Sequence, residues 1–178
     1  MTPADVVAFW TEAGPKAWYR KSKAFDAEIS RRFEALHFAA SRGELDGWAD
    51  TPEGALALLL LLDQFPRNMF RGSPHAFATD PLARRVARTA VDKGFDARVE
   101  PGLRQFFYLP FEHSEQLEDQ DRAVALCAAS GDADLEKWAR LHRDIIARFG
   151  RFPHRNPCLG RATTAEEQAF LNGGGFSG

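Results

Sequence analysis

The stretch ALALLLLLDQFPRN, Ala55–Asn68, decides how this chain folds. Its first eight residues, Ala55–Leu62, are all apolar, and charged and amide side chains follow directly. A helix that is apolar on every side has no face for solvent, so in a soluble protein it lies in the core. Charges attached to the end of such a helix are costly to bury unless they find partners. We therefore expect a central helix that delivers a polar cluster to the interior or to the floor of a cleft.

Pro66 interrupts this helix. It has no amide proton and it crowds the preceding turn, so we expect a break or kink between Leu62 and Phe65.

The remaining segments also have helical periodicity. Apolar residues at steps of three and four predict a long amphipathic helix over Lys23–Arg42. The aromatic block Phe106–Phe111 is compatible with a short strand or a broken helix, and we favour the helix because the chain contains no second strand to pair with it. Thr164 and Glu167 form a capping box that opens the last helix. One further helix has the predicted inward stripe Leu135, Trp138, Leu141, Ile145 and Phe149.

These segments predict an all-α protein of about seven or eight helices, with consecutive helices packed as antiparallel hairpins. We expect one domain over residues 1–172 and a flexible glycine-rich tail at 173–178. A chain of 178 residues is long enough to bury a core without disulfides or metal.

The composition excludes several classes of protein. Lys and Arg number 23 against 25 Asp and Glu, for a net charge of -2, which does not predict a nucleic-acid-binding protein. The start MTPADVVAFW lacks the features of a signal peptide. The apolar run would rise only about 12 Å as a helix, whereas a bilayer core is about 30 Å thick. We expect a cytoplasmic protein without membrane contact, and the oligomeric state stays open.

The candidate site residues are polar side chains set beside bulky apolar residues. The predicted ligand-binding residues are Asp63, Arg67, Asn68, Arg71, Arg155 and Asn156, and the candidates for catalysis are Glu112, His113 and His154. Arginine forks match carboxylates and phosphates in two-point geometry. If these segments converge, they form a pocket for a small anion or an acidic peptide end.

The same residues have structural interpretations. Asp63, Arg67 and Asp80 are also typical of buried ion pairs that join loops to helices. Ser114 is better explained as the cap of a helix over Glu115–Ala129 than as a nucleophile. No two of the five histidines are three or four residues apart, so we predict no metal site and no cofactor. His142 is interpreted as a hydrogen-bonded packing residue.

Four sequence motifs are distinctive: LLDQFPRNMFRG (Leu61–Gly72), FATDP (Phe77–Pro81), FFYLPFEHSE (Phe106–Glu115) and RFPHRNPCLGR (Arg151–Arg161). The chain resembles the bacterial family known as domain of unknown function 924 in these motifs, in its Phe9-Trp10 start and in its AEEQAFL ending. The resemblance implies a tetratricopeptide-like stack of helical hairpins. It brings no catalytic residues.

Two functions remain open. One is a binder of a small carboxylate or phosphate ligand, with Glu112 or a histidine for hydrolytic or acid–base chemistry and arginines that stabilise negative charge. The other is an interaction module that holds a partner peptide on a concave face, with the polar cluster purely structural. A closed pocket lined by these residues favours the first. An open groove with exposed aromatic residues such as Trp18, Trp48 or Tyr108 favours the second.

Overall fold

The computed structural model describes residues 1–176, which form helices joined by turns and loops. No strand occurs among these residues, so the predicted all-α class is confirmed. The α-helices are α1 (Pro3–Ala13), α2 (Pro15–Trp18), α3 (Lys23–Ser41), α4 (Pro52–Leu59), α5 (Phe65–Met69), α6 (His75–Ala78), α7 (Asp80–Asp92), α8 (Leu109–Glu112), α9 (Leu117–Ser130), α10 (Ala133–Phe149) and α11 (Ala165–Asn172). Short 3-10 turns are η1 (Asp46–Asp50), η3 (Asp96–Arg98), η4 (Pro101–Phe107) and η5 (Pro153–Arg155), and η2 (Leu60–Gln64) is a π-helical turn.

The chain divides into two compact units. Unit 1 comprises Met1–Arg71 and His75–Pro110, and unit 2 comprises Gly72–Pro74 and the residues from Phe111 onward. Each unit is described by itself. The single domain predicted for 1–172 stays a prediction, as does the flexible tail at 173–178, of which residues 177 and 178 lie outside the described residues.

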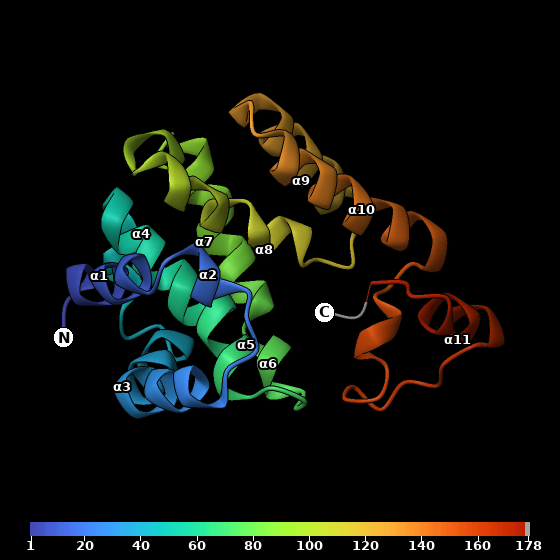
Figure 1. Cartoon of the computed structure of the whole chain (residues 1–178). Coiled ribbons are helices and arrows are strands. Elements are labelled where there is room, and N and C mark those ends of the chain that lie inside the picture. The colour runs from blue at the N-terminus through green and yellow to red at the C-terminus, as the bar shows by residue number, and fades with distance from the viewer. Residues whose placement is uncertain (177–178) are drawn as a thin grey trace. The chain divides into compact units, whose positions relative to one another are not determined.

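The apolar run forms the centre of unit 1, as its sequence predicts. Each residue of Ala55–Leu62 has at most 3% of its surface exposed. The helix α4 contacts α1 and α7, and α5 continues it and contacts α3 (Figure 1). The core of unit 1 is thus built around this rod.

The interruption expected at Pro66 takes the form of the π-helical turn Leu60–Gln64, and the chain stays helical from Pro52 to Met69. Within it the amide of Phe65 donates to the carbonyl of Leu60, five residues earlier. The next donor in that register would be Pro66, which has none. The carbonyls of Leu61 and Leu62 instead accept from side chains outside the helix, His37 at 2.8 Å and Thr79 at 2.6 Å.

Gly54 lets the start of α4 approach the preceding turn. A Cβ at this position would lie 2.1 Å from the carbonyl oxygen of Trp48, which no side chain tolerates. Thr51 caps the same helix by accepting from the Gly54 amide. This close contact fixes where the central helix begins.

Unit 2 contains the hairpin of α9 and α10, which lie side by side (Figure 1). The inward stripe predicted for α10 is wrong in part, because Trp138 is 50% exposed and Leu141 is 39% exposed. The helix buries Ala139, His142, Ile145 and Ile146 instead. The buried face therefore combines an alanine and an imidazole with two isoleucines, and it does not include the larger Trp138 and Leu141.

The segment around the aromatic block is helical, and the strand alternative is excluded by η4 and α8. Ser114 does not cap the next helix. That helix begins at Leu117 with Gln116 as its N-cap, and the Ser114 hydroxyl donates to Asp119 at 2.7 Å. The capping box of Thr164 and Glu167 is present at the start of α11.

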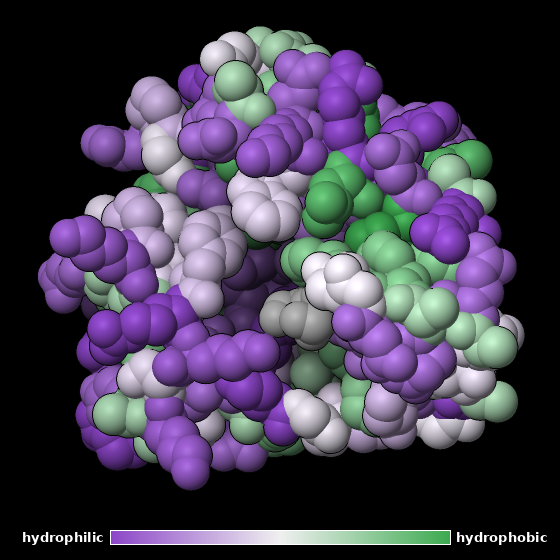
Figure 2. Space-filling view, turned by 45° about the vertical axis from the view of Figure 1, so that its right-hand side comes forward, coloured by the Kyte–Doolittle hydropathy of each residue, from purple (hydrophilic) through white to green (hydrophobic). Residues whose placement is uncertain are grey.

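Hydrophilic residues cover much of the face seen in Figure 2, and hydrophobic residues occupy smaller areas of it. Among residues 1–176, none of the helices combines the length and the apolar character needed to cross a bilayer. The tetratricopeptide-like stacking implied by the resemblance stays a prediction.

Candidate functional site

The candidate residues divide between the two units. Asp63, Arg67, Asn68 and Arg71 belong to unit 1, at the end of the central helix. Glu112, His113, His154, Arg155 and Asn156 belong to unit 2.

Arg67 in unit 1 is matched by two carboxylates. Its Nη1 and Nη2 donate to the two oxygens of Asp80 at 2.9 and 3.0 Å, and Nη1 lies 3.2 Å from Asp63 Oδ1. Asp63 is 1% exposed and Asp80 is 5% exposed. Burial alone would lower the pKa of Arg67, but the two carboxylates outweigh it and raise this pKa. Asp63, Arg67 and Asp80 therefore form a buried ion-pair group, which is the structural alternative to a ligand site named in the sequence analysis.

Arg71 and Asn68 meet a different acid, Asp26 of α3. Arg71 donates from Nε and Nη2 to both oxygens of Asp26, at 3.0 and 2.9 Å, and Asn68 Nδ2 donates to one of them at 2.8 Å. These contacts join α5 to α3. Both predicted guanidinium groups of unit 1 are therefore held by carboxylates of the chain itself.

Unit 2 has a buried pair that the sequence did not predict, Glu112 with His142. His142 Nδ1 lies 3.0 Å from Glu112 Oε1 and 2.8 Å from the carbonyl oxygen of Trp138. The side chains of His142 and Glu112 are 8% and 6% exposed. Because both neighbours of Nδ1 are acceptors, this nitrogen carries the proton, and Nε2 is the basic nitrogen of the neutral ring.

Gln120 of α9 positions the segment that carries Glu112. Its Nε2 donates to the backbone carbonyls of Glu112 and Ser114, at 2.6 and 2.7 Å. Gln120 is fully buried, and these bonds satisfy carbonyls at the end of α8. The backbone at Glu112 is thereby held against α9.

His154 lies close to this pair and is electrically neutral. Burial, followed by the nearby charge of the Arg155 guanidinium, lowers its pKa to about 3. Its Nδ1 is buried and has no hydrogen-bond partner among the described residues. Buried polar atoms are nearly always hydrogen-bonded, so an orphaned ring nitrogen calls for an explanation.

An aromatic ring covers the two imidazoles. The Phe176 ring lies 4.4 Å from that of His142 and 5.2 Å from that of His154, between centroids. Gly175 makes this fold-back of the chain feasible, since a Cβ there would lie 2.6 Å from the Phe170 ring. His142 and His154 therefore both meet Phe176 in edge-to-face contacts within unit 2.

Arg155 is 7% exposed. Its Nη1 donates to the carbonyl of His113 at 3.1 Å, and its guanidinium carbon lies 4.5 Å above the Phe152 ring. His113 thus enters the site through its backbone oxygen. Arg155 also contributes to the lowered pKa values of Glu115 and His154.

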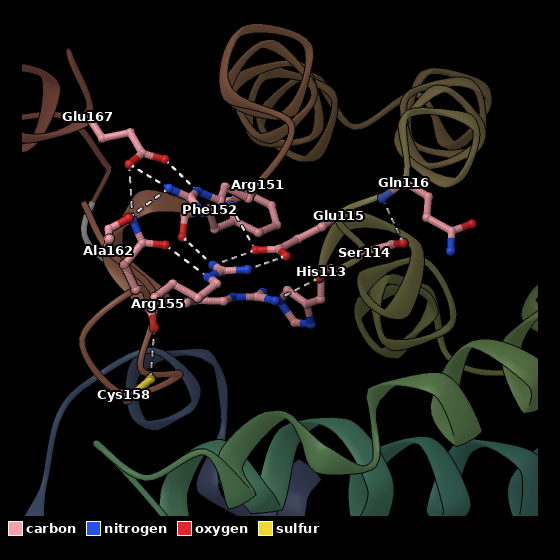
Figure 3. A network of polar contacts seen from close by, with 12 residues as sticks. His113, Ser114, Glu115, Gln116, Arg151, Phe152, Arg155, Cys158, Ala162 and Glu167 are labelled. Atoms are coloured by element: carbon pink, nitrogen blue, oxygen red, sulfur yellow. Dashed lines mark hydrogen bonds and ion pairs between the residues drawn. The ribbon is translucent and has the colours of Figure 1, made fainter. Parts of the chain in front are cut away.

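The loop that carries Arg155 is braced by two ion pairs that the sequence did not assign (Figure 3). Arg161 donates to both oxygens of Glu115, at 2.7 and 3.0 Å. Arg151 donates to both oxygens of Glu167, at 2.6 and 2.9 Å. In Figure 3 Glu167 lies on one side of the loop and Glu115 on the other. The charged residues in and around the 151–161 loop are visible in the sequence. Which arginine pairs with which glutamate could not be predicted from it.

Asn156 lies inside this bracing. Its Nδ2 donates to Glu167 at 3.2 Å, and its Oδ1 accepts from Arg161 at 2.9 Å. The bonds from Arg151, and then the Thr164 amide, lower the pKa of Glu167 to about 2. Asn156 is fully buried, and its hydrogen bonds to Glu167 and Arg161 stabilise the conformation of the loop.

Comparison with known proteins identifies the family. The model of a bacterial protein family of unknown function, DUF924, matches residues 6–175. This chain belongs to that family. A chain of known structure is similar to it: a protein of unknown function from Agrobacterium tumefaciens is 52% identical, with a TM-score of 0.93 over 96% of this chain and 97% of the other. No curated protein matches this DUF924 chain.

Proposed function

We propose that unit 2 binds a small carboxylate or phosphate ligand beside His154 and Arg155, with Glu112 and His142 as an acid–base pair. The observation that carries this proposal is the buried, unpartnered Nδ1 of His154 next to a buried guanidinium. A ligand with an anionic group and a hydroxyl would pair with both, because Arg155 donates to oxygen and neutral His154 accepts from O–H.

The pair of Glu112 and His142 supplies the chemistry. The carboxylate accepts the Nδ1 proton of His142 and so fixes the orientation of the ring, as in other carboxylate–histidine pairs. His142 Nε2 would then take a proton from a water molecule or from a ligand hydroxyl, and return it in a later step. The guanidinium of Arg155 would stabilise the negative charge that develops.

The guanidinium groups of unit 1 are less suited to a ligand. Arg67 and Arg71 each face a carboxylate in two-point geometry, so an incoming anion would have to displace Asp80 or Asp26. Asp63 and Asn68 take part in the same contacts. This is the reason to place the ligand in unit 2.

The interaction-module alternative has less support. Two of the aromatic residues expected on an open peptide-binding groove are buried, since Trp18 is 8% exposed and Tyr108 is 4% exposed. Trp18 donates from its indole to the Trp10 carbonyl, and Tyr108 donates to Asp96. Both side chains serve the core of unit 1.

Titration calorimetry with inorganic phosphate and a set of small hydroxycarboxylates tests the proposal. We expect the wild type to bind at least one of them, and Arg155→Gln to bind it at least tenfold more weakly. Arg71→Gln is the matched control and should bind as the wild type does, because Arg71 is tied to Asp26. Circular dichroism verifies that each variant is folded.

Glu112→Gln tests the acid–base role. It should keep the affinity for the anion but lose most of any hydrolytic activity toward its esters, together with the acidic limb of the pH profile. A wild type that binds none of these anions, or an Arg155→Gln variant with unchanged affinity, would exclude the proposed site.

A further inference from the structure

Unit 1 contains a second histidine pair that the proposed function does not use. His37 lies on α3 and His75 begins α6, and their Nε2 atoms are 3.4 Å apart. His37 is fully buried, whereas His75 is partly exposed. Two ring nitrogens that face each other across this distance either share one proton or bind a common ion.

The backbone of the central helix fixes the orientation of His37. Its Nδ1 lies 2.8 Å from the carbonyl oxygen of Leu61, the carbonyl that the missing amide of Pro66 would meet in the π-helical register. A carbonyl only accepts, so Nδ1 carries the proton and the lone pair of the neutral ring is on Nε2. That lone pair is directed at His75.

Aromatic rings hold both imidazoles in place. The Phe70 ring lies 4.1 Å from that of His75 and 5.6 Å from that of His37, and Phe38 is 5.5 Å from His75. Rings packed in this way restrict rotation of the imidazoles. The two Nε2 atoms are therefore pre-positioned.

We propose that His37 and His75 bind a divalent transition-metal ion, Zn²⁺ or another ion that prefers imidazole, through their Nε2 atoms. Two Zn–N bonds of about 2.0–2.1 Å at the tetrahedral angle place the nitrogens about 3.3–3.4 Å apart. The separation in unit 1 is 3.4 Å. The bond from His37 Nδ1 to a backbone carbonyl is the usual second contact of a metal-bound histidine.

The site would be open to solvent ligands. Among residues 1–176, no group of three or more His, Cys, Asp and Glu side chains is placed to hold an ion. Water or an external ligand would therefore occupy the two remaining positions of the tetrahedron, one more than in the usual open zinc site with three protein ligands. His75, the more exposed of the pair, lies on the side of entry.

Zn²⁺ titration of the full chain against a competing chromophoric chelator tests this inference. We expect one equivalent to bind to the wild type, and His75→Gln to bind at least tenfold more weakly. His113→Gln is the control, because it removes a partly exposed histidine from unit 2. It should retain wild-type affinity.

A second measurement does not depend on a variant. Nitrogen-15 NMR of the wild type should show that Zn²⁺ shifts the Nε2 resonances of His37 and His75 and leaves the Nδ1 resonance of His37 protonated. Zn²⁺ affinity that is equal in the wild type and His75→Gln, or unshifted Nε2 resonances at saturating Zn²⁺, would overturn the inference and leave a plain hydrogen bond between the rings. Neither result bears on anion binding in unit 2.

Discussion

The two units differ in how their polar side chains are paired. In unit 1 each predicted arginine meets carboxylates in two-point geometry, and the resulting group joins helices. In unit 2 similar pairs brace the 151–161 loop, but His154 retains a ring nitrogen without a partner. Charge density alone therefore does not locate a binding site. A buried group with unused bonding capacity is the more informative sign.

The largest expected effect comes from breaking the matched group of unit 1. Arg67→Met removes the guanidinium that the buried carboxylates of Asp63 and Asp80 share, and we expect the free energy of unfolding to fall by about 3–5 kcal/mol. Urea denaturation at pH 7 measures it. Arg71→Met is the control, since that side chain is 40% exposed, and should cost about 1 kcal/mol or less. Equal costs for the two variants would contradict the distinction between them.

His154 gives unit 2 a pH dependence of its own. Its folded pKa of about 3 lies below the ordinary value of 6.5, so between these limits the unfolded chain binds a proton that the folded chain does not. The contribution of neutral His154 to the free energy of unfolding is complete above pH 6.5. It falls as the pH is lowered, by at most about 1.4 kcal/mol per pH unit. Relative to His154→Asn, the wild type should therefore lose stability as the pH falls from 6.5 toward 3 in urea titrations. A difference that is independent of pH would refute this.

Glu167 acts in a more acidic window. Its folded pKa of about 2 lies below the ordinary value of 4.5, so its stabilising contribution is present above pH 4.5 and is lost as the pH falls toward 2. Glu167→Gln should lower the melting temperature at pH 6 and make little difference at pH 2. Differential scanning calorimetry across this range measures both. A melting difference as large at pH 2 as at pH 6 would show that the bracing does not depend on the charge.

The smallest effect is expected from Phe176→Ala, which uncovers the imidazoles of unit 2. Modification of His142 and His154 by diethyl pyrocarbonate, followed by mass spectrometry, should become severalfold faster. His75 in unit 1 serves as the internal reference and should react at an unchanged rate. If all three histidines respond alike, Phe176 is not a specific cover.

The sequence predicted what local chemistry determines. The apolar run Ala55–Leu62, the effect of Pro66 and the capping box of Thr164 depend on neighbouring residues, and each is found where expected. The face of α10 was predicted wrongly, because Trp138 and Leu141 are larger and more apolar than His142. Which side of a helix is buried depends on what packs against it, and one sequence does not contain that information.

The sequence identified several residues of the candidate site, but it did not predict which residues contact each other. Glu112 and His154 were singled out, yet the partner of Glu112 is His142, thirty residues on in another helix. The contact between His37 and His75 was not predicted, because spacing along one helix was the only available test for paired histidines. Partners brought together by tertiary folding leave no periodic signal.

The π-helical turn has a consequence for how this family tolerates insertions and deletions. Such a turn is equivalent to one extra residue in an α-helix, so loss of one leucine from Leu60–Leu62 would restore regular geometry and leave both flanks facing as before. In that shortened helix the carbonyl now held by His37 would regain a backbone donor. A relative lacking that leucine should therefore also lack the paired imidazoles, so helix length and histidine content should change together across the family.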